Sequence, residues 1–285
     1  MTFMQYLQTQ QLAPKTVRRY SVDIGRLKDW LGVEQISESE FHYNDLMAFI
    51  QHITEDGMGK RRISQLLCII RHYCSYMISE EQRTDNPAAG VFIKGINRSV
   101  PVNLLATEEM DLLYQQYQIQ LHVSDGNKIM LGLLVYQGLT VAELIRLKAH
   151  HFLIRDGRVI IKGTRHTSER KMNLEAHQIE PLQQYIKASK GKEGYLFVEP
   201  KKQQVSEKNI SNRLQYMFYQ LRQLNPKVIS AKQIRMSVIT NWLKKHSLRE
   251  TQYLAGHKYV SSTARYQTTN LDDLQQALKD HHPLK

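Results

Sequence analysis

A histidine and a tyrosine near the end of the sequence have the residue types of a nucleophile and its proton partner. The stretch LAGHKYVSSTARYQT (residues 254–268) places His257 nine residues before Tyr266. Tyr is a weak nucleophile with a pKa near 10, and His can exchange a proton near neutral pH. One straight helix would separate the two by about 13 Å. Gly256 favours a helix end, however, and Ser261 or Ser262 is a natural N-cap, so we expect two short helices that fold His257 back toward Tyr266, for chemistry or for packing.

Two further stretches supply cations. KQIRMS holds Lys232 and Arg235 three residues apart, which puts both on one side at the start of a helix. IKGTRHTSERK holds Lys162, Arg165 and Arg170 at or beside a turn. The planar donor fork of Arg matches two phosphate oxygens, although an isolated cation of this kind usually lies on the surface. No stretch is specific alone. Their order and spacing along the chain are more informative than any one of them.

The elements that must position these residues are of two kinds. FLIRDGRVIIKG (152–163) has two β-rich runs around Asp156-Gly157, which predicts a hairpin, and ERKMNLE (169–175) alternates like a third strand. Helical periodicity follows in EPLQQYIKA, SEKNISNRLQYMFYQLRQL and IRMSVITNWLKKH. We therefore expect the second half of the chain to be α+β, with a small antiparallel sheet on one side of a helical domain.

The first hundred residues are expected to be helical. One apolar stripe with helical spacing ends at Gly32 and consists of Val17, Tyr20, Ile24, Leu27 and Leu31. A second stripe runs from Ile63 to Met77 and carries basic residues at and after its start: Lys60, Arg61, Arg62 and Arg71. A helix that is apolar on one side and basic at its N-terminal end is suited to lie against a phosphate backbone. A solvated charged face is the alternative for this stretch alone.

A change of character near residue 100 predicts a domain boundary. DNPAAG (85–90) ends the helical region, and INRSVPVNLLA (96–106) is typical of an extended linker. Thr107 is then expected to cap a new helix, EEMDLLYQQY. We therefore expect two domains, residues 1–100 and 101–285, and a chain that is mainly α overall.

The charge is concentrated in the second half of the chain. The 285 residues have a net charge of +12. Residues 1–103 hold 12 Lys and Arg against 11 Asp and Glu, whereas residues 104–285 hold 27 against 16. Such an asymmetry favours a polyanion, and nucleic acid fits better than a membrane because no basic amphipathic anchor accompanies the charge. No secretory signal or membrane span is visible, and Cys68 and Cys74 are expected to be buried free thiols of a cytoplasmic protein.

In their order and spacing, these stretches resemble the tyrosine recombinase, or phage integrase, family. That family carries a histidine or lysine three residues before an arginine, then LGH, then a tyrosine nine residues after that histidine. The matching residues are Lys232, Arg235, His257 and Tyr266. LAPKTVRRYSVDIGRLKDWL and RHYCSYMISEEQRTDNPAAGV are similar to the opening and the end of the family's helical core-binding domain. LLATEEMDLLY, GLTVAELIRLKAHHF and RVIIKG are similar to successive parts of its catalytic domain, so the resemblance extends over nearly the whole chain.

The resemblance implies a site-specific DNA recombinase that needs no metal or other cofactor. The Tyr266 hydroxyl would attack a DNA phosphate and form a 3′-phosphotyrosyl link, and Arg235 would hold that phosphate. His257 would donate to the phosphate or shuttle the proton of the nucleophile. Lys162 matches the lysine that protonates the leaving 5′-oxygen, and Lys232 would give a fixed charge where many members have histidine. Integration, excision or inversion, as in a mobile element, are the outcomes that such an enzyme serves.

One position departs from the family. Where the family has Gly-Leu-Arg before a helix, this chain has GLTVAEL, so that Thr140 stands in place of an arginine. Thr140 and Glu143 make a capping box, which preserves the helix start. The phosphate nevertheless loses a donor, a change that typically costs about 10²–10³ in rate. Arg146 lies about 240° round the same helix and is a poor substitute. We hypothesise that Arg165 or Arg170, which share the hairpin region, replaces the missing arginine.

The active recombinase has two alternatives, and the end of the sequence bears on how the protein assembles. A catalytically weak or inactive DNA-binding relative is the alternative that Thr140 favours, and a type IB topoisomerase-like activity is a third. We favour the active recombinase because a decayed site has no reason to keep its other functional residues together. The final stretch, LDDLQQALKDHHPLK, has leucines at helical spacing. In this family such tails commonly dock on a neighbouring subunit, which implies a homotetramer on paired DNA sites; a helix folded onto its own domain is the other possibility.

Overall fold

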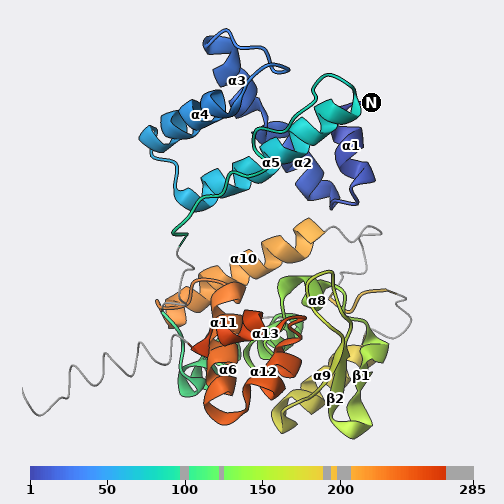
Figure 1. Cartoon of the computed structure of the whole chain (residues 1–285). Coiled ribbons are helices and arrows are strands. Elements are labelled where there is room, and N and C mark those ends of the chain that lie inside the picture. Colours follow the sequence, from blue (N-terminus) through green and yellow to red (C-terminus); the bar gives the residue numbers. More distant parts are fainter. Residues whose placement is uncertain (97–102, 122–124, 189–193, 198–206, 268–285) are drawn as a thin grey trace, which may run out of the picture. The chain divides into compact units, whose positions relative to one another are not determined.

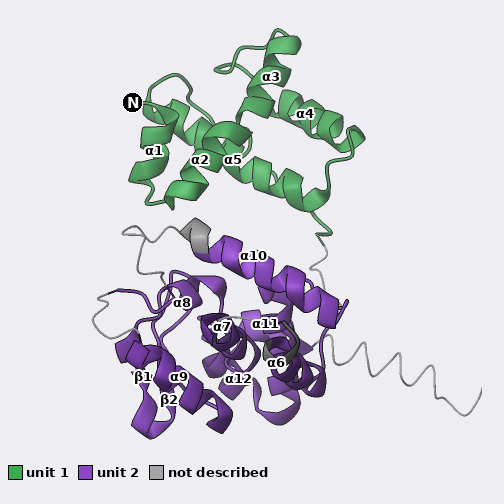
Figure 2. Ribbon diagram, turned by 180° about the vertical axis from the view of Figure 1, so that it is seen from behind, with its two compact units in different colours: residues 1–98 green, residues 99–285 purple. Residues whose placement is uncertain are grey.

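The computed structural model describes residues 1–96, 103–121, 125–188, 194–197 and 207–267 (Figure 1). The chain divides into two compact units, Met1–Arg98 and Ser99–Lys285, shown in separate colours in Figure 2. Unit 1 is helical in all its described elements, and unit 2 combines helices with a three-stranded antiparallel sheet. The expected fold class, mainly α with a small antiparallel sheet, is confirmed. The final stretch from Leu271, with its predicted docking helix, lies outside the described residues.

Unit 1 is built from five helices around one apolar core. They are α1 (Phe3–Thr9), α2 (Pro14–Asp23), α3 (Gly25–Val33), α4 (Tyr43–Glu55) and α5 (Lys60–Ser79). The single stripe expected to end at Gly32 is in fact divided between α2 and α3, which meet at Ile24. Ile24 keeps a right-handed conformation and its carbonyl accepts from Leu27 and Lys28, so the apolar phase continues across the break. That continuity is why the sequence pattern looked like one helix.

The apolar stripe of α5 is buried as expected, and so is one of the two thiols. Ile63, Leu66, Ile70 and Met77 are each no more than 2% exposed in the core of unit 1. Cys74 is fully buried, and burial raises the pKa of its thiol to about 11. Cys68 is free but only partly buried, so the expected burial is wrong for this thiol.

Unit 2 places its helices around a second core. Its helices are α6 (Thr107–Leu121), α7 (Asp125–Val135), α8 (Val141–Ile145), α9 (Ala176–Ala188), α10 (Glu207–Leu224), α11 (Ala231–Lys245), α12 (Leu248–Ala255) and α13 (Val260–Ala264). α6 begins at Thr107 itself, so this residue is not the cap that precedes the helix; the N–H of Ala106 instead donates to the Glu109 carboxylate at 2.9 Å. In both views α9 lies beside the sheet at one side of the unit (Figures 1 and 2).

The sheet confirms the expected hairpin and third strand. β1 (Phe152–Leu153) pairs antiparallel with β2 (Arg158–Ile161), and β2 pairs antiparallel with β3 (Arg170–Asn173). The turn between β1 and β2 passes through Gly157 at φ +60°, a left-handed conformation that Gly adopts without strain. In β3, alternate residues are buried and exposed, so that Arg170 points inward with Met172.

Helix α11 is fixed at its back by the chain that enters unit 2. The backbone N–H of Leu105 donates to the Ser237 hydroxyl at 2.9 Å, and the Asn241 amide donates to the Leu105 carbonyl at 3.1 Å. The Gln233 amide donates to the Asn103 carbonyl at 2.6 Å. These three side chains follow one another at helical spacing, so their bonds fix the rotation of α11 about its axis and leave the opposite face toward a cavity. That face carries the candidate functional residues.

Within the part of the chain that the structure describes, no helix is long and apolar enough to span a membrane.

Candidate active site

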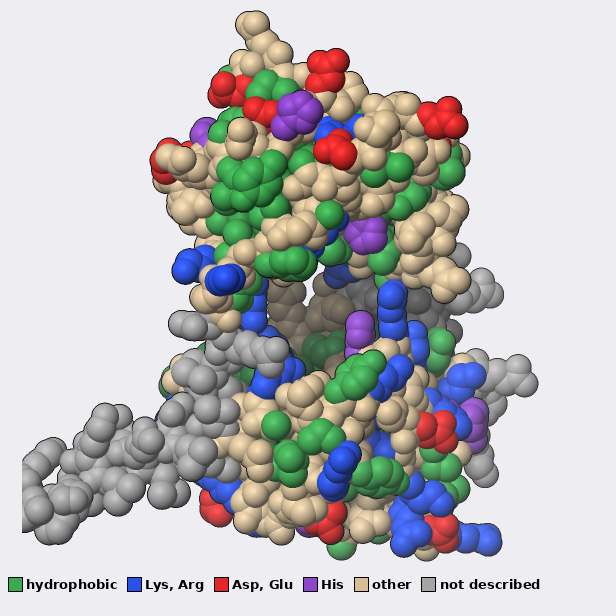
Figure 3. All heavy atoms as spheres, viewed as in Figure 1, with side chains coloured by type: hydrophobic (Ala, Val, Ile, Leu, Met, Phe, Trp, Pro, Cys, Tyr) green, Lys and Arg blue, Asp and Glu red, His purple; other side chains and the backbone are tan. Residues whose placement is uncertain are grey.

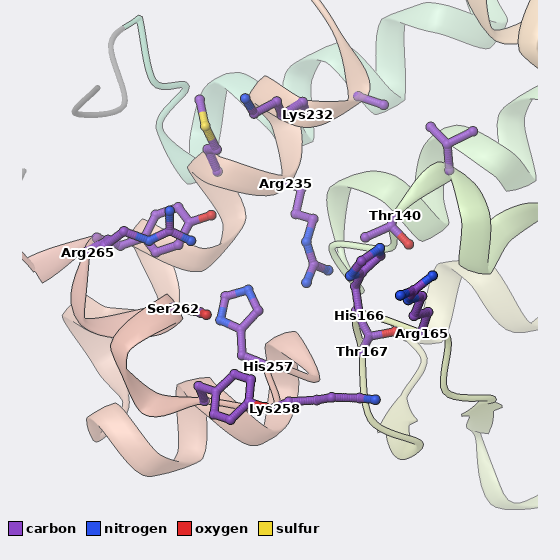
Figure 4. Close-up of a pocket in the computed structure, with 15 residues that line it drawn as sticks. Thr140, Arg165, His166, Thr167, Lys232, Arg235, His257, Lys258, Ser262 and Arg265 are labelled. Atoms are coloured by element: carbon purple, nitrogen blue, oxygen red, sulfur yellow. The ribbon is translucent and has the colours of Figure 1, made fainter. Parts of the chain in front are cut away.

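A cavity of about 720 Å³ in unit 2 brings together residues from four separate parts of the sequence. Ser230 caps α11, its hydroxyl accepting the N–H of Gln233 at 3.3 Å, so that Lys232 and Arg235 lie on the first turns of the helix. Both residues line the cavity, as the sequence spacing indicated. Figure 4 shows Arg235 pointing into the cavity toward His257. The polar side chains of the lining also include Thr140, Arg165, His166, Thr167, Lys258, Ser262, Arg265 and Tyr266.

Arg235 is held in one orientation by two backbone carbonyls. Its guanidinium donates to the carbonyl of Gly138 and, at 2.5 Å, to that of Ala255, and the residue is 9% exposed. Burial lowers the pKa of this guanidinium, and the nearby Glu143 carboxylate opposes the shift. A guanidinium has five N–H donors, and two of them are used on these carbonyls. The remaining N–H groups are fixed in direction and can donate to an anion without reorganisation of the side chain.

The turn that carries His257 and Tyr266 folds as two short helices. α12 ends at Gly256, which has φ +66° and so gives the chain its left-handed exit, and α13 follows from Val260. The expected cap at Ser261 or Ser262 is wrong, because both lie inside α13 and Tyr259 precedes it without a side-chain capping bond. The helix starts earlier than the hydroxyl residues suggested.

The fold brings His257 and Tyr266 face to face. Their rings stack with centroids 6.1 Å apart and an interplanar angle of 15°. The His257 Nδ1 atom lies 2.8 Å from the hydroxyl oxygen of Thr263, which is fully buried. The carbonyl of Thr263 in turn accepts the N–H of Tyr266 at 2.9 Å. Thr263 therefore fixes both functional residues, one through its side chain and the other through its backbone.

The electrostatic setting favours a neutral histidine and a protonated tyrosine. Burial lowers the pKa of His257 to about 4, and the neighbouring guanidinium of Arg235 adds to this shift, followed by those of Arg265 and Arg170. Burial raises the pKa of the Tyr266 phenol, whereas Arg235 and Arg265 counteract that rise. His257 can thus act as a neutral donor or acceptor near neutral pH, and Tyr266 needs its proton removed.

The hairpin between β2 and β3 docks on this turn. Thr167 pairs with His257 in an antiparallel bridge, and the N–H of Ser168 donates to the Gly256 carbonyl at 2.8 Å. The docking brings Arg165 to the cavity wall, where Figure 4 shows it across from His257. Arg165 is exposed, so its guanidinium faces solvent at the rim.

Lys162 does not line the cavity in this structure. Its ammonium group donates to both carboxylate oxygens of Glu169 at 3.0 Å, across the base of the same hairpin. The two side chains are 53% and 56% exposed, and an ion pair this exposed is worth about 0–1 kcal/mol. Lys162 can therefore exchange this partner for another anion at little cost.

Thr140, which stands where the family has an arginine, lines the cavity, whereas Arg170, one of its two proposed substitutes, does not. Thr140 lines the cavity and forms the expected capping box, its hydroxyl accepting the N–H of Glu143 at 3.2 Å. Arg170 is 2% exposed and lies behind the cavity, where its guanidinium donates to the two carboxylate oxygens of Glu143 at 2.6 and 3.3 Å. Of the two proposed substitutes, only Arg165 reaches the cavity wall.

The basic residues of α5 in unit 1 differ in what they contact. Lys60 and Arg61 are exposed at the start of the helix, where Lys and Arg side chains gather on the face seen in Figure 3. Arg62 donates to the Asp23 carboxylate at 2.6 Å. Arg71 donates to the carbonyls of Ala88 and Val91, and its guanidinium lies over the ring of Phe92. Arg71 therefore serves the fold of unit 1, unlike the exposed pair.

Sequence reasoning missed several residues that line or support the cavity. Thr263 could not be singled out from the neighbouring serines, because only the turn shows which hydroxyl faces His257. Arg265 was detectable as a cation next to a candidate nucleophile, and Lys258 as one next to His257. No group of His, Cys, Asp and Glu that could hold a metal ion occurs among the residues that the structure describes.

Two family models match the chain. The one described as the phage integrase family matches residues 103–272, and the one described as the phage integrase, N-terminal SAM-like domain matches residues 1–81. Tyrosine recombinase XerD of Proteus mirabilis is 25% identical over 283 residues, which cover 96% of this chain and 89% of that protein. Tyrosine recombinase XerC of Bacillus pumilus is 23% identical over 298 residues, which cover 99% and 95%.

Solved structures of similar fold include recombinases on DNA. The XerH site-specific recombinase bound to palindromic difH substrate, a post-cleavage complex, superposes with a TM-score of 0.73 at 17% identity, covering 95% of this chain and 81% of that one. A lambda integrase dimer bound to a COC′ core site gives a TM-score of 0.66 at 15% identity, covering 93% and 74%. At such identities the likeness establishes the fold alone.

Proposed function

Because this chain belongs to the phage integrase family of tyrosine recombinases, we propose that Tyr266 is the nucleophile with which it cuts and rejoins DNA. The chain is a site-specific DNA recombinase, and the regulatory relative without catalysis is not favoured by the comparisons. The single observation that carries the assignment of Tyr266 is its position in the cationic cavity, stacked on His257.

The proposed reaction is a pair of transesterifications. The phenolic oxygen of Tyr266 attacks the phosphorus of a DNA phosphodiester, a P–O bond to tyrosine forms, and the bond from phosphorus to the 5′-oxygen breaks. The phenol loses its proton, and the 5′-oxygen gains one and leaves as a hydroxyl. Attack by a 5′-hydroxyl of another strand on the 3′-phosphotyrosyl bond reverses these steps and returns the phenol. One phosphoester replaces another at each step, so no external energy source is required.

The phosphate would be held by Arg235 and Lys232. Arg235 is supported by its guanidinium already being fixed on two carbonyls, with other donors aimed into the cavity. Lys232 adds a point charge from the preceding turn of the same helix, on the cavity wall. Fixed cations stabilise the charge that develops on the phosphorane without reorganising during the reaction.

His257 would act as a neutral hydrogen-bonding group. If the Thr263 hydroxyl donates to Nδ1, then Nε2 carries the ring proton and donates to a phosphate oxygen. The opposite tautomer would let Nε2 accept the proton of Tyr266. We propose the first arrangement, because the phosphate bears the growing negative charge and a neutral donor is the group that the buried ring can supply near pH 7.

Two hairpin residues would complete the site. Lys162 is the proposed general acid for the 5′-oxygen, and its weak, exposed pairing with Glu169 allows the hairpin to deliver it when DNA is bound. Arg165 is the proposed phosphate contact in place of the arginine that is absent at Thr140, since its side chain lies on the cavity wall. Substitution of Arg165 by Ala should slow cleavage about 10²-fold.

We further propose how the protein engages its substrate. Exposed Lys60 and Arg61, with Arg62 beside them, would contact the DNA backbone from unit 1, and the cavity of unit 2 would take the scissile phosphate. A homotetramer assembled on paired sites through the C-terminal helix, and a cytoplasmic location, stay predictions from the sequence. Residues 1–100 and 101–285 would then be the DNA clamp and the catalytic domain.

The test is a nicked suicide substrate that carries the binding site. After cleavage the short 5′-hydroxyl strand diffuses away, so a covalent protein–DNA band accumulates on a denaturing gel. We expect this band with the wild-type chain and its loss in Tyr266→Phe. Tyr253→Phe is the matched control, because that exposed phenol lies on α12 outside the cavity. Tight DNA binding without a covalent band would instead favour the non-catalytic relative.

A further inference from the structure

Glu143 is a buried carboxylate directly behind the candidate phosphate site. Its side chain is fully buried, and one oxygen accepts from both the N–H and the hydroxyl of Thr140 at 2.8 and 2.9 Å. The same oxygen lies 3.9 Å from a terminal nitrogen of Arg235. A lone buried carboxylate here would attract Arg235 and repel an incoming phosphate. Its charge therefore has to be cancelled by something other than Arg235.

Arg170 supplies that cancelling charge from strand β3. Its guanidinium approaches the two oxygens of Glu143 with two parallel bonds, and no part of its side chain is exposed. It is also packed beneath the turn before His257, since a Cβ atom added at Gly256 would lie 2.5 Å from a terminal nitrogen of Arg170. Glu143 and Arg170 together are neutral, which leaves the positive charge of Arg235 uncompensated within the cavity.

Resting on the proposed function, we propose that Arg170 is a positioning residue that neutralises Glu143 and so keeps Arg235 available to the scissile phosphate. The role of the missing arginine is thus divided in this chain. Arg165 faces the phosphate at the rim, whereas Arg170 faces Glu143 from behind. Thr140 caps the start of α8 and completes the hydrogen bonds of the same carboxylate.

A charge-cancelling pair of substitutions tests this division. Arg170→Gln leaves Glu143 unpaired, so we expect cleavage of the suicide substrate to slow about 10²-fold at saturating DNA. Glu143→Gln with Arg170→Gln removes both charges and retains amides that can bond to each other and to Thr140. We expect this double variant to cleave within about tenfold of the wild type, because Arg235 is again uncompensated. Arg158→Gln, an exposed arginine on the adjacent strand, is the matched control.

Two outcomes would overturn the proposal. One is a folded Arg170→Gln variant that cleaves at the wild-type rate. The other is a folded, DNA-bound double variant that stays about 10²-fold slow, which would mean that the phosphate needs the charge of Arg170 itself. Thermal melting checks folding. If Arg170→Gln alone does not fold, the double variant is measured by itself. Cleavage within about tenfold of the wild type supports the proposal, and cleavage that is about 10²-fold slower overturns it.

A second readout does not depend on cleavage. Arg170 lowers and Glu143 raises the pKa of His257, so an NMR titration of His257 without DNA should show a higher pKa in Arg170→Gln and a return toward the wild-type value in the double variant. When Arg170→Gln does not fold, the double variant is compared with the wild type alone. A His257 pKa that is unchanged in Arg170→Gln overturns the proposal. If the wild-type chain gives no covalent band, the proposed function is refuted. The NMR titration of His257 then still tests whether Arg170 neutralises Glu143.

Discussion

Replacement of Thr263 by Val is the sharpest perturbation of the turn that holds His257 and Tyr266. Valine has nearly the same shape as threonine, so the buried packing of this fully buried side chain is retained. What disappears is the hydroxyl that lies 2.8 Å from Nδ1 of His257. The backbone bond from Tyr266 to the carbonyl of residue 263 is unaffected. The change therefore removes the partner of His257 without removing the nucleophile or its position.

The size of the effect follows from the burial of the ring. A buried polar atom that loses its partner costs about 1–3 kcal/mol. In a unit of this size, each kcal/mol lowers the melting temperature by about 2–4 °C, so the variant stays folded at 25 °C. If His257 donates through Nε2 only while its ring is held by Thr263, misplacement of the ring should slow cleavage about 10²-fold.

The assay is single-turnover cleavage of the suicide substrate at saturating protein, with binding measured in parallel. Thr263→Ser is the matched control, since it retains the hydroxyl and should cleave within about fivefold of the wild type. We expect unchanged DNA affinity for both variants. If Thr263→Val cleaves at the wild-type rate although its His257 ring has lost the hydrogen bond, this bond does not position the histidine for catalysis and the reasoning is refuted.

Three further predictions concern pH, the general acid and DNA binding. The pKa of His257 is about 4 in the folded chain and near 6.5 in the unfolded chain. The neutral form of His257 therefore contributes its full stability above about pH 6.5, and this contribution is lost as the pH falls toward 4. The cleavage rate should show no titration of His257 between about pH 6 and 8, and an NMR titration of His257 in that range would contradict this. Lys162→Ala should cleave slowly on ordinary DNA but regain its rate on a 5′-bridging phosphorothiolate, because a thiolate leaves without a proton; no recovery would exclude Lys162 as the acid. Arg61→Ala should reduce the slope of log affinity against log salt by about 1 without lowering the melting temperature, whereas Arg71→Met should lower the melting temperature; equal effects on both measurements would contradict their different contacts.

Periodicity and turn chemistry predicted most of the elements, because these signals are local. The hairpin at Asp156-Gly157, the third strand and the long apolar stripe of α5 depend on a few neighbouring residues, and all three are observed. Boundaries were less predictable. A helix break occurs at Ile24, although the apolar stripe continues across it. The helix α13 begins at Val260, before Ser261 and Ser262, the two residues that were expected to cap it.

The candidate site was predictable in composition but not in its supporting contacts. Lys232, Arg235, His257 and Tyr266 line one cavity, as their spacing indicated. The partners that hold them come from distant segments, as when the carbonyls of Gly138 and Ala255 fix Arg235. From the sequence, Arg165 and Arg170 were equivalent candidates to replace the arginine absent at Thr140. Only the alternation of β3 shows that Arg170 is turned inward to Glu143.

The most direct test of the central assignment is to identify the amino acid that becomes joined to DNA. Trypsin cleavage after Arg265 and Lys279 releases the peptide YQTTNLDDLQQALK, in which Tyr266 is the only tyrosine. After the suicide substrate is trapped and the DNA is digested with nuclease, mass spectrometry should find a 3′-linked nucleotide phosphate on this peptide, at Tyr266. A covalent adduct that maps to any other residue, or a peptide that stays unmodified while the adduct forms, would contradict the account.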